Sequence, residues 1–177
     1  MLSHILVAVA VIGVASGCAG PTPVPTLPPE PTTTPVFATE EEALAAATQA
    51  YAEYLAVSDE IGHGGWLETQ GYAAVVTGDA LDEELEGAQS YVDEGWRLVG
   101  TSTFDSMVLQ TYETDGGTAS VTAYVCLDVS GTDVVDSSGA SVVGPDRSTR
   151  LPLEVEFIGT NELLLARSDL WSGDSFC

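Results

Sequence analysis

Residues 119–129 read ASVTAYVCLDV, and this stretch decides the fold. Apolar residues occupy every second position from Ala119 to Val129, and mostly polar residues stand between them. Because the side chains of a strand point alternately to its two faces, the pattern predicts a long strand with one buried face. A strand of this kind needs neighbours on its edges and a layer over its apolar face.

Turn signals divide the rest of this region into further strands. Asp115-Gly116-Gly117 is typical of a hairpin turn, and residues 137–139 and 159–161 predict two more turns. The segment before the last turn is expected to bury Leu153, Val155 and Phe157. The other predicted strands are 96–104, 106–113 and 162–171.

The region before residue 96 predicts helices. Thr39 and Glu42 form a capping box, and the glycines of 62–65 end the helix that it opens. A short helix is expected at about 69–76. The predicted buried face of the first helix carries Leu44, Ala47, Tyr51, Leu55 and Tyr54.

A further helix is predicted to begin with Asp79 as its N-cap. Its predicted apolar face, at 4-3-4 spacing, consists of Leu81, Leu85, Ala88 and Val92. Carboxylates near its start suit the positive end of the helix dipole, and we expect them to form a solvated face. These acidic residues are Asp82, Glu83, Glu84 and Glu86. Helices followed by antiparallel strands predict an α+β fold, in which N-terminal helices pack on a strongly curved antiparallel sheet.

The N-terminus predicts export. Residues 5–14 form an apolar run too short to cross a bilayer but of the length found in signal peptides. The following order Val14-Ala15-Ser16-Gly17-Cys18 resembles the lipobox of bacterial lipoproteins, which implies that Cys18 is diacylated and becomes the mature N-terminus. An ordinary signal peptide with an incidental cysteine is the alternative. Only His4 precedes the apolar run where a basic residue is usual, so either the natural start lies upstream or the export signal is weak, and we favour an upstream start.

Residues 21–35 hold seven of the nine prolines and predict an extended spacer. The expected organisation is therefore a lipoprotein signal peptide (1–17), the lipidated Cys18 with a Pro/Thr-rich linker (18–37), and a single α+β domain (38–177). The expected location is the outer face of the cytoplasmic membrane, within the cell envelope, with the lipid anchor as the contact to the membrane.

The charge balance excludes nucleic acid as a partner. The chain has 27 acidic residues, four arginines and no lysine, for a formal net charge of −23. It cannot supply the cations that displace counterions from a phosphate backbone, and anionic lipid headgroups repel it. The 45% apolar content argues against a disordered acidic tail. We interpret the charge as a solubility feature of a tethered domain.

Lipidation of Cys18 leaves two cysteines, Cys126 and Cys177. In an exported chain these two are expected to form a disulfide, which ties the last residue to the long central strand. A metal site is the competing interpretation, but two thiols without a second histidine are a poor ligand set. We therefore expect neither a metal nor a cofactor.

Three groups of polar residues are candidates for chemistry. His63 stands alone in a glycine-rich loop, either as a catalytic base or as a loop histidine at a helix end. Glu154 and Glu156 share one strand face at about the spacing of a glycosidase pair, but they most simply point to solvent. A calcium site is the third possibility, although this segment alternates as a strand does. Its ligands would be Asp128, Asp133, Asp136 and Ser130.

Four aromatic residues are candidates for a pocket. Tyr51, Tyr54, Trp66 and Tyr72 are expected where the early helices meet the concave sheet. Aromatic residues with a few hydroxyls line small-molecule pockets, and the same residues also build cores. Core packing is the favoured interpretation, and the pocket remains the alternative.

Several segments together carry a family resemblance: Gly95–Gly100 (GWRLVG), the C-x-D-x-S of Cys126, Asp128 and Ser130, and Trp171–Cys177 (WSGDSFC). With the N-terminal helices, they make the chain look like uncharacterised lipoproteins of high-GC Gram-positive bacteria. The resemblance implies the cone-shaped fold of nuclear transport factor 2. That fold serves dehydratases, isomerases, non-catalytic pockets and assembly modules, so it does not decide function.

The primary hypothesis is a membrane-anchored, non-catalytic binding or interaction domain, whose protein or small-molecule partner and oligomeric state are unknown. A small-molecule enzyme of the dehydratase or isomerase type, using the cone pocket, is the alternative. A phage or mobile-element lipoprotein acting in surface exclusion is a further alternative. A buried carboxylate with a strongly raised pKa facing a pocket would favour the enzyme.

Overall fold

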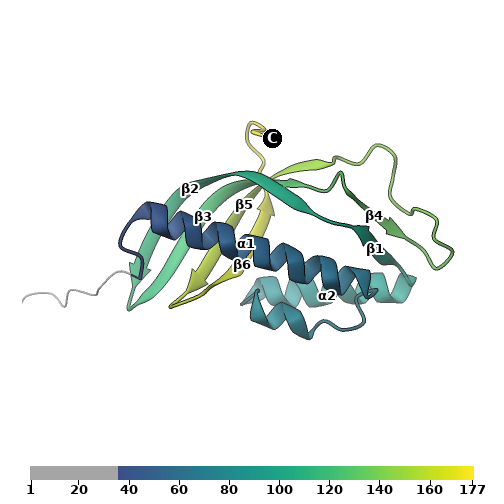
Figure 1. Cartoon of the computed structure of the whole chain (residues 1–177), viewed down its shortest axis with the longest axis horizontal. Helices are drawn as coiled ribbons and strands as arrows, with labels where there is room; N and C mark the ends of the chain where they lie inside the picture. Colours follow the sequence, from purple (N-terminus) through teal and green to yellow (C-terminus); the bar gives the residue numbers. More distant parts are fainter. Residues whose placement is uncertain (1–35) are drawn as a thin grey trace, which may run out of the picture. The chain divides into compact units, whose positions relative to one another are not determined.

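The computed structural model describes residues 36–177, so the predicted signal peptide, Cys18 and most of the predicted linker lie outside the described residues. Two α-helices, a short 3-10 helix and six strands occur in this part of the chain (Figure 1). In chain order the elements are α1 (Glu40–His63), η1 (Gln70–Ala74), α2 (Asp79–Glu94), β1 (Arg97–Gly100), β2 (Thr103–Asp115), β3 (Thr118–Asp128), β4 (Thr132–Val135), β5 (Arg150–Gly159) and β6 (Leu163–Leu170).

The main sheet has four antiparallel strands in the order β2-β3-β5-β6. The long alternating segment forms β3, and its apolar residues Ala119, Val121, Ala123 and Val125 are fully buried. α1 runs across this face of the sheet and contacts β2, β3 and β6 (Figure 1). The predicted α+β fold, with helices on an antiparallel sheet, is therefore confirmed.

Aromatic rings fill the layer between α1 and the sheet. Tyr51 projects from α1 into the core and meets Phe104 and Phe157 edge-on, with ring centroids 4.9 and 6.3 Å apart. Leu153, Val155 and Phe157 on β5 are all buried, as the alternation predicted. Burying one such side chain contributes about 1.5–3 kcal/mol, so this layer is the main source of stability.

The start of α1 is capped by Thr39. The Thr39 hydroxyl oxygen accepts a hydrogen bond from the Glu42 amide at 3.2 Å, as the capping box predicts. The Glu42 carboxylate reaches one residue further back and accepts from the Ala38 amide at 2.8 Å. Two amides at the helix start are thus satisfied by side chains.

The predicted strand 96–104 is divided in the structure. β1 pairs with β4 in a separate two-stranded sheet, and Thr103 already belongs to β2 in the main sheet. Gly100 ends β1 with φ at 85°, and a Cβ there would lie 1.9 Å from the Gly131 carbonyl oxygen. The backbones approach too closely for any side chain, which explains the glycine.

The second helix differs from its prediction at two points. Asp79 is the first residue of α2 rather than its N-cap, and Gly78 occupies the N-cap position without a side-chain hydrogen bond. Leu85, predicted on the apolar face, is 39% exposed. Glu84, predicted on the solvated face, is half-buried instead. The buried face of α2 is therefore rotated about the helix axis relative to the predicted face.

The segment between η1 and α2 is fixed to the edge of the main sheet. Val76 forms a parallel bridge to Leu165 on β6. The Thr77 amide donates to the Leu165 carbonyl at 2.8 Å, and the Leu165 amide donates to the Val75 carbonyl at 2.9 Å. These bonds set the start of α2 beside β6.

The C-terminus folds over the outer face of the sheet. Cys177 is joined by a disulfide to Cys126, a fully buried residue on that face of β3. The tail also packs Trp171 and Phe176 on Tyr124, with ring centroids 4.5 and 5.6 Å away. Within residues 36–177, none of the helices combines the length and apolar character that crossing a membrane requires.

Candidate functional site

A small cavity lies where α1, α2 and β6 meet. Its volume is about 210 Å³. Within it, the hydroxyl of Tyr54 on α1 donates a 2.5 Å hydrogen bond to Oε1 of Glu84 on α2. The residues that line it are Tyr54, Ala80, Glu83, Glu84, Leu165 and Ser168. The cavity thus combines two carboxylates and two hydroxyls with an apolar wall.

Burial raises the pKa of the Glu84 carboxyl above its ordinary value. Hydrogen bonding from the Tyr54 and Tyr72 hydroxyls lowers the same pKa in part, and the nearby charge of Glu83 raises it further. A carboxylate that loses water without gaining a cation is less stable when ionised. Glu84 is therefore the electrostatically strained group of this site.

The tyrosines around Glu84 are held in their protonated form. Burial raises the pKa of Tyr72 to about 12. Burial, together with the charge of Glu84, raises the pKa of Tyr51 and of Tyr54 well above the ordinary tyrosine value. Near neutral pH these hydroxyls therefore serve as neutral hydrogen-bond donors.

The four aromatic candidates from the sequence do lie in one region. Tyr51 stacks on Tyr54 with ring centroids 5.8 Å apart, and the Tyr72 hydroxyl lies 3.4 Å from the Ser58 hydroxyl. Trp66 is buried. Of the four, only Tyr54 lines the cavity, while Tyr51 and Tyr72 are about 1% exposed and belong to the core.

Trp66 extends the same aromatic region towards α2. Its ring stacks on Tyr91 at a centroid distance of 4.1 Å. Hydrogen bonding by the Trp66 side chain also lowers the Tyr72 pKa slightly, against the larger effect of burial. Trp66 is thus a packing residue behind the site.

Sequence reasoning missed Glu84 as a site residue. Its place with three acidic neighbours suggested a solvated face, yet Ala80, Glu84, Ala88 and Tyr91 share one side of a helix at 4-4-3 spacing. Ala80 and Ala88 are buried. Ala80, Ala88 and Tyr91 favour this side of the helix as the inward face, whereas the single Leu85 favours another side. This difference could have identified the inward face.

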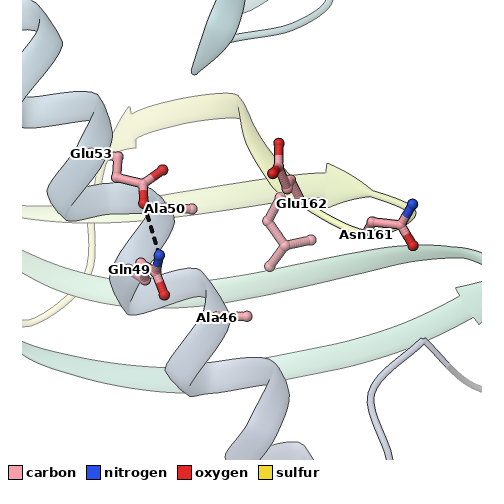
Figure 2. A pocket seen from close by; sticks show the side chains of 7 residues that line it. Ala46, Gln49, Ala50, Glu53, Asn161 and Glu162 are labelled. Carbon is pink, nitrogen blue, oxygen red and sulfur yellow. Dashed lines mark hydrogen bonds between the residues drawn. The ribbon is translucent and has the colours of Figure 1, made fainter.

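A second, smaller hollow lies nearer the start of α1, next to the turn between β5 and β6. Its volume is about 130 Å³ (Figure 2). The Gln49 amide donates to the Glu53 carboxylate at 2.8 Å within α1, and Asn161 and Glu162 stand opposite on the turn. All four side chains are exposed or half-buried and lie at the surface. This hollow is a surface depression between two elements.

An open apolar groove of about 330 Å³ follows α1 near the junction of β1 and β2. Asp59, one of its lining residues, is 6% exposed. Its two carboxylate oxygens accept hydrogen bonds from the Ser102 amide and hydroxyl, each at 2.8 Å. Both oxygens are therefore engaged in holding the chain between the two sheets against α1.

His63 is the last residue of α1. Its Nε2 lies 2.6 Å from the carbonyl oxygen of Gly100, at the end of β1. This contact joins the end of the helix to the small sheet, which agrees with a loop histidine at a helix terminus.

Glu154 and Glu156 lie on the outer face of β5. Arg167 on β6 bonds to Glu154 at 2.9 Å, to Glu156 at 3.4 Å and to Asp169 at 2.7 Å. Arg167 thus pairs with three carboxylates of this face. The two glutamates are engaged in an ion-pair group.

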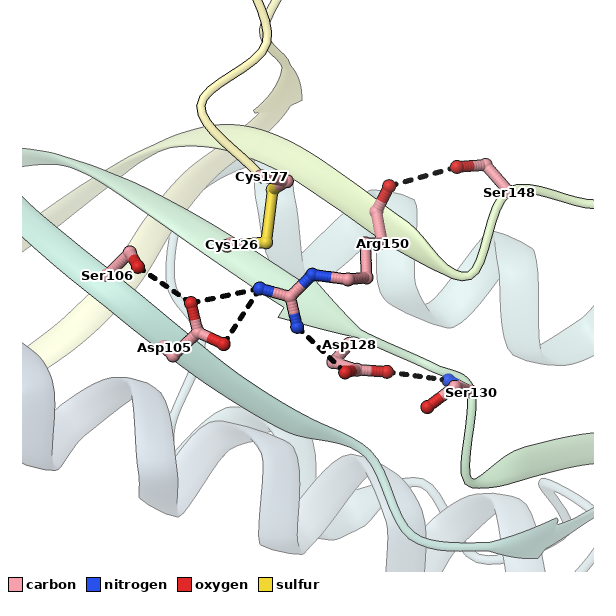
Figure 3. Close-up of polar contacts among 8 residues, drawn as sticks. All are labelled: Asp105, Ser106, Cys126, Asp128, Ser130, Ser148, Arg150 and Cys177. Atoms are coloured by element: carbon pink, nitrogen blue, oxygen red, sulfur yellow. Dashed lines mark hydrogen bonds and ion pairs between the residues drawn. A yellow bond between two sulfur atoms is a disulfide. The ribbon is translucent and has the colours of Figure 1, made fainter.

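A second arginine joins three strands of the same face. Arg150 on β5 bonds to Asp105 on β2 and to Asp128 on β3, each at 2.8 Å, close to the disulfide (Figure 3). Bonds from Arg150 and Ser106 lower the pKa of Asp105. For Asp128 the main cause of a lowered pKa is hydrogen bonding from Ser130, with Arg150 adding to it.

The aspartates considered for calcium are used separately. Asp128 pairs with Arg150, Asp133 accepts from Ser141 at 2.7 Å, and Asp136 accepts from the Ser138 amide at 2.8 Å. Among residues 36–177 no three histidine, cysteine or acidic side chains are grouped so that they could hold a metal ion. The three aspartates thus have separate partners in the described part of the chain.

No protein-family model and no curated protein matches the sequence. Solved structures with a similar fold include the intermembrane space region of the chloroplast protein ARC6, with a TM-score of 0.51 and 12% identity over 73% of this chain and 97% of that chain. At this identity the likeness concerns the fold alone.

Two further structures match with lower scores. One is an NTF2-like designed protein, with a TM-score of 0.32 and 13% identity over 71% of this chain and 99% of that chain. The other is a cyanobacterial iota-carbonic anhydrase complexed with bicarbonate, with a TM-score of 0.32 and 14% identity over 82% of this chain and 99% of that chain.

Proposed function

We propose that the chain is a lipid-anchored extracytoplasmic protein whose folded domain binds a small ligand without transforming it. In this proposal the signal peptide directs export, diacylated Cys18 holds the protein at the outer face of the membrane, and the proline-rich linker spaces the domain from it. The lipobox-like order of residues 14–18 supports the anchor.

The cavity beside Tyr54 and Glu84 is the observation that carries the binding function. Binding sites are concave, have apolar walls and place a few polar groups to fix the ligand. Here Glu84 is a half-buried polar group directed to the cavity, and the almost fully buried Ala80 and Leu165 close it from behind.

Glu84 does not meet the criterion stated above for an enzyme, because it is only half-buried and hydrogen bonds from Tyr54 and Tyr72 offset part of the rise in its pKa. The state of the hydroxyl groups also supports binding over catalysis. A tyrosine acts as a base only when it loses its proton, and burial raises the pKa of Tyr54 and Tyr72. Glu84 already accepts the Tyr54 hydrogen bond. The site is therefore organised to hold a ligand by hydrogen bonds and charge.

The anchor is tested by mass spectrometry of the protein from its native membrane. We expect a mature N-terminus at Cys18 that carries a diacylglycerol, and we expect Cys18→Ala to be recovered without the lipid. A mature protein with an unmodified residue 18, or with an N-terminus elsewhere, would contradict the anchor.

The binding function is tested by screening the full chain with cationic, neutral and anionic small molecules. Amide chemical shifts of residues lining the cavity report binding. Ser168→Leu should fill the cavity mouth and abolish the response, whereas Thr111→Leu, a matched change at an exposed position of β2, should leave it intact. If no compound shifts the cavity residues, or if both variants respond alike, the proposal fails.

A further inference from the structure

We propose that the cavity beside Tyr54 and Glu84 binds a small organic ammonium, whose charged head pairs with Glu84. This inference deepens the proposed binding function and rests on it. It follows from the distribution of cations in the domain, from the acceptors in the cavity, and from the cavity's size.

The positive charges of the domain lie away from the cavity. The five ion pairs found in residues 36–177 all belong to Arg150 or Arg167, and both arginines lie on the outer face of the main sheet. The sequence has no lysine. Glu83 and Glu84 therefore face the cavity without a cationic side chain from the described part of the chain. An incoming cation would supply the missing charge.

The donors of an ammonium match the acceptors of the cavity. A primary ammonium has three N–H donors and no acceptor, and an ionised carboxylate offers about four lone-pair sites. The Glu84 carboxylate takes hydrogen bonds from Tyr54 and Tyr72, which leaves about two of its lone-pair sites for a ligand. Glu83 and the Ser168 hydroxyl add oxygen acceptors at the cavity wall. The polar wall thus suits a cluster of donors.

The buried charge of the cavity disfavours anionic and neutral ligands. An anion would meet the like charges of Glu83 and Glu84, and a neutral molecule would leave the desolvated Glu84 charge uncompensated. Burial already raises the Glu84 pKa, so the ionised form gains most from a cation. The net charge of −23 also raises the local concentration of cations around the domain.

The volume of the cavity and the ligands that it offers limit the kind of cation that fits. A cavity of about 210 Å³ is smaller than the roughly 300–1,000 Å³ of sites for drug-sized ligands, so the ligand is small. A bare divalent ion would need about six or more oxygen ligands, but no metal-binding group occurs among residues 36–177. An organic ammonium needs fewer oxygen ligands, because its three N–H groups are satisfied by about three acceptors. Ala80 and Leu165 are almost fully buried behind the polar groups, so the room for a hydrocarbon stem is small.

The test compares three molecules of similar shape on the full chain at pH 7 and constant ionic strength: n-butylammonium, 1-butanol and butyrate. Affinities are measured from chemical shifts of the cavity residues. We expect n-butylammonium to bind at least about tenfold more tightly than the other two, because only the ammonium adds the attraction of opposite charges to its hydrogen bonds with Glu84.

Three variants make the test specific. Glu84→Gln keeps the shape of the side chain and should weaken n-butylammonium binding about tenfold or more. Glu86→Gln removes the same charge from an exposed position of α2 and should leave the affinity unchanged. Ser168→Leu should abolish binding by filling the cavity. Far-ultraviolet circular dichroism and thermal midpoints confirm that each variant is folded.

The outcomes separate this inference from the proposed function. If 1-butanol or butyrate binds the cavity as tightly as the ammonium, the ligand class is wrong while the binding function stands. If Glu84→Gln and Glu86→Gln weaken binding equally, the ammonium is held by general charge, and the inference is overturned. If no molecule of any class shifts the cavity residues, both proposals fail.

Discussion

The hydroxyl of Tyr54 and the carboxylate of Glu84 form a 2.5 Å hydrogen bond across 30 residues of sequence. The bond connects α1 to α2 beside the edge of β6, where the parallel bridge at Val76 fixes the start of α2. It also places a half-buried carboxylate on the wall of a cavity. The contact is therefore both a link between elements and the centre of the candidate site.

The first prediction concerns pH and Glu84. Burial raises its pKa in the folded state above the value of about 4.3 typical of an unfolded chain. The folded protein thus binds this proton more tightly, so the group's contribution to stability is greatest below the unfolded pKa and is lost as pH rises through the folded pKa.

We therefore expect wild type to lose stability relative to Glu84→Gln as pH rises from about 4 to 7. Urea unfolding at several pH values measures this difference, with Glu86→Gln as the control for loss of one charge. The titratable neighbours are Glu83 and the tyrosines, and the tyrosines stay protonated in this range. A difference that grows in favour of wild type with pH would contradict the prediction.

The second prediction concerns the Tyr54 hydroxyl. Tyr54→Phe removes the donor and leaves the carboxylate of Glu84 without its shortest hydrogen bond. Hydrogen bonds to charged groups contribute about 1.5–3 kcal/mol, so we expect a loss of that order at pH 7. In a Glu84→Gln background the same change should cost less, and a double-mutant cycle measures the difference. Equal costs in both backgrounds would show that the two groups are not coupled.

The fold was largely predictable because its signal is periodic. Alternation over Ala119–Val129 identified the buried face of β3, and Thr39 identified the start of α1. Both signals depend on local geometry alone. The division of 96–104 into β1 and β2 was not predictable, because it depends on β1 pairing with β4 in a second sheet.

The third prediction concerns the disulfide. Cys126 and Cys177 are 51 residues apart, and closing a loop of this length contributes roughly 4 kcal/mol in the chain-entropy model. Cys177→Ser is expected to lower the free energy of unfolding by about this amount, as should reduction of the wild type. Urea unfolding with and without a reductant measures it. Unchanged stability in Cys177→Ser would contradict the prediction.

The fourth prediction concerns Arg150. Its bonds lower the pKa of Asp105, and they add to the effect of Ser130 on Asp128. Carboxyls with a lowered folded pKa stabilise the protein above their unfolded pKa, about 3.9, and this contribution is lost as pH falls through the folded pKa.

Arg150→Gln should therefore destabilise the protein at pH 7 and have a smaller effect at pH 2–3 and in 1 M salt, which screens exposed charges. Arg97→Gln removes an exposed arginine outside the five ion pairs and serves as the control. Thermal midpoints at each condition measure the effect. An effect of Arg150→Gln that is independent of pH and salt would argue against an electrostatic role.

The candidate site was only half predictable. Tyr54 was among the aromatic candidates because its position on the first helix placed it towards the sheet. Glu84 was assigned to a solvated face because acidic residues at a helix start usually are solvated. Its burial depends on the rotation of α2, which is set by the bonds of Thr77 and Leu165 at the edge of the sheet. Such long-range contacts leave no local pattern.

The most direct test of the account is the titration of the Glu84 side-chain carboxyl by ¹³C NMR, in the free full chain and with saturating n-butylammonium. We predict a raised pKa in the free protein, because burial disfavours the ionised form, and a lower pKa when the ammonium is bound, because the cation favours it. A Glu84 pKa at or below the ordinary glutamate value in the free protein, or one that n-butylammonium leaves unchanged, would contradict the account.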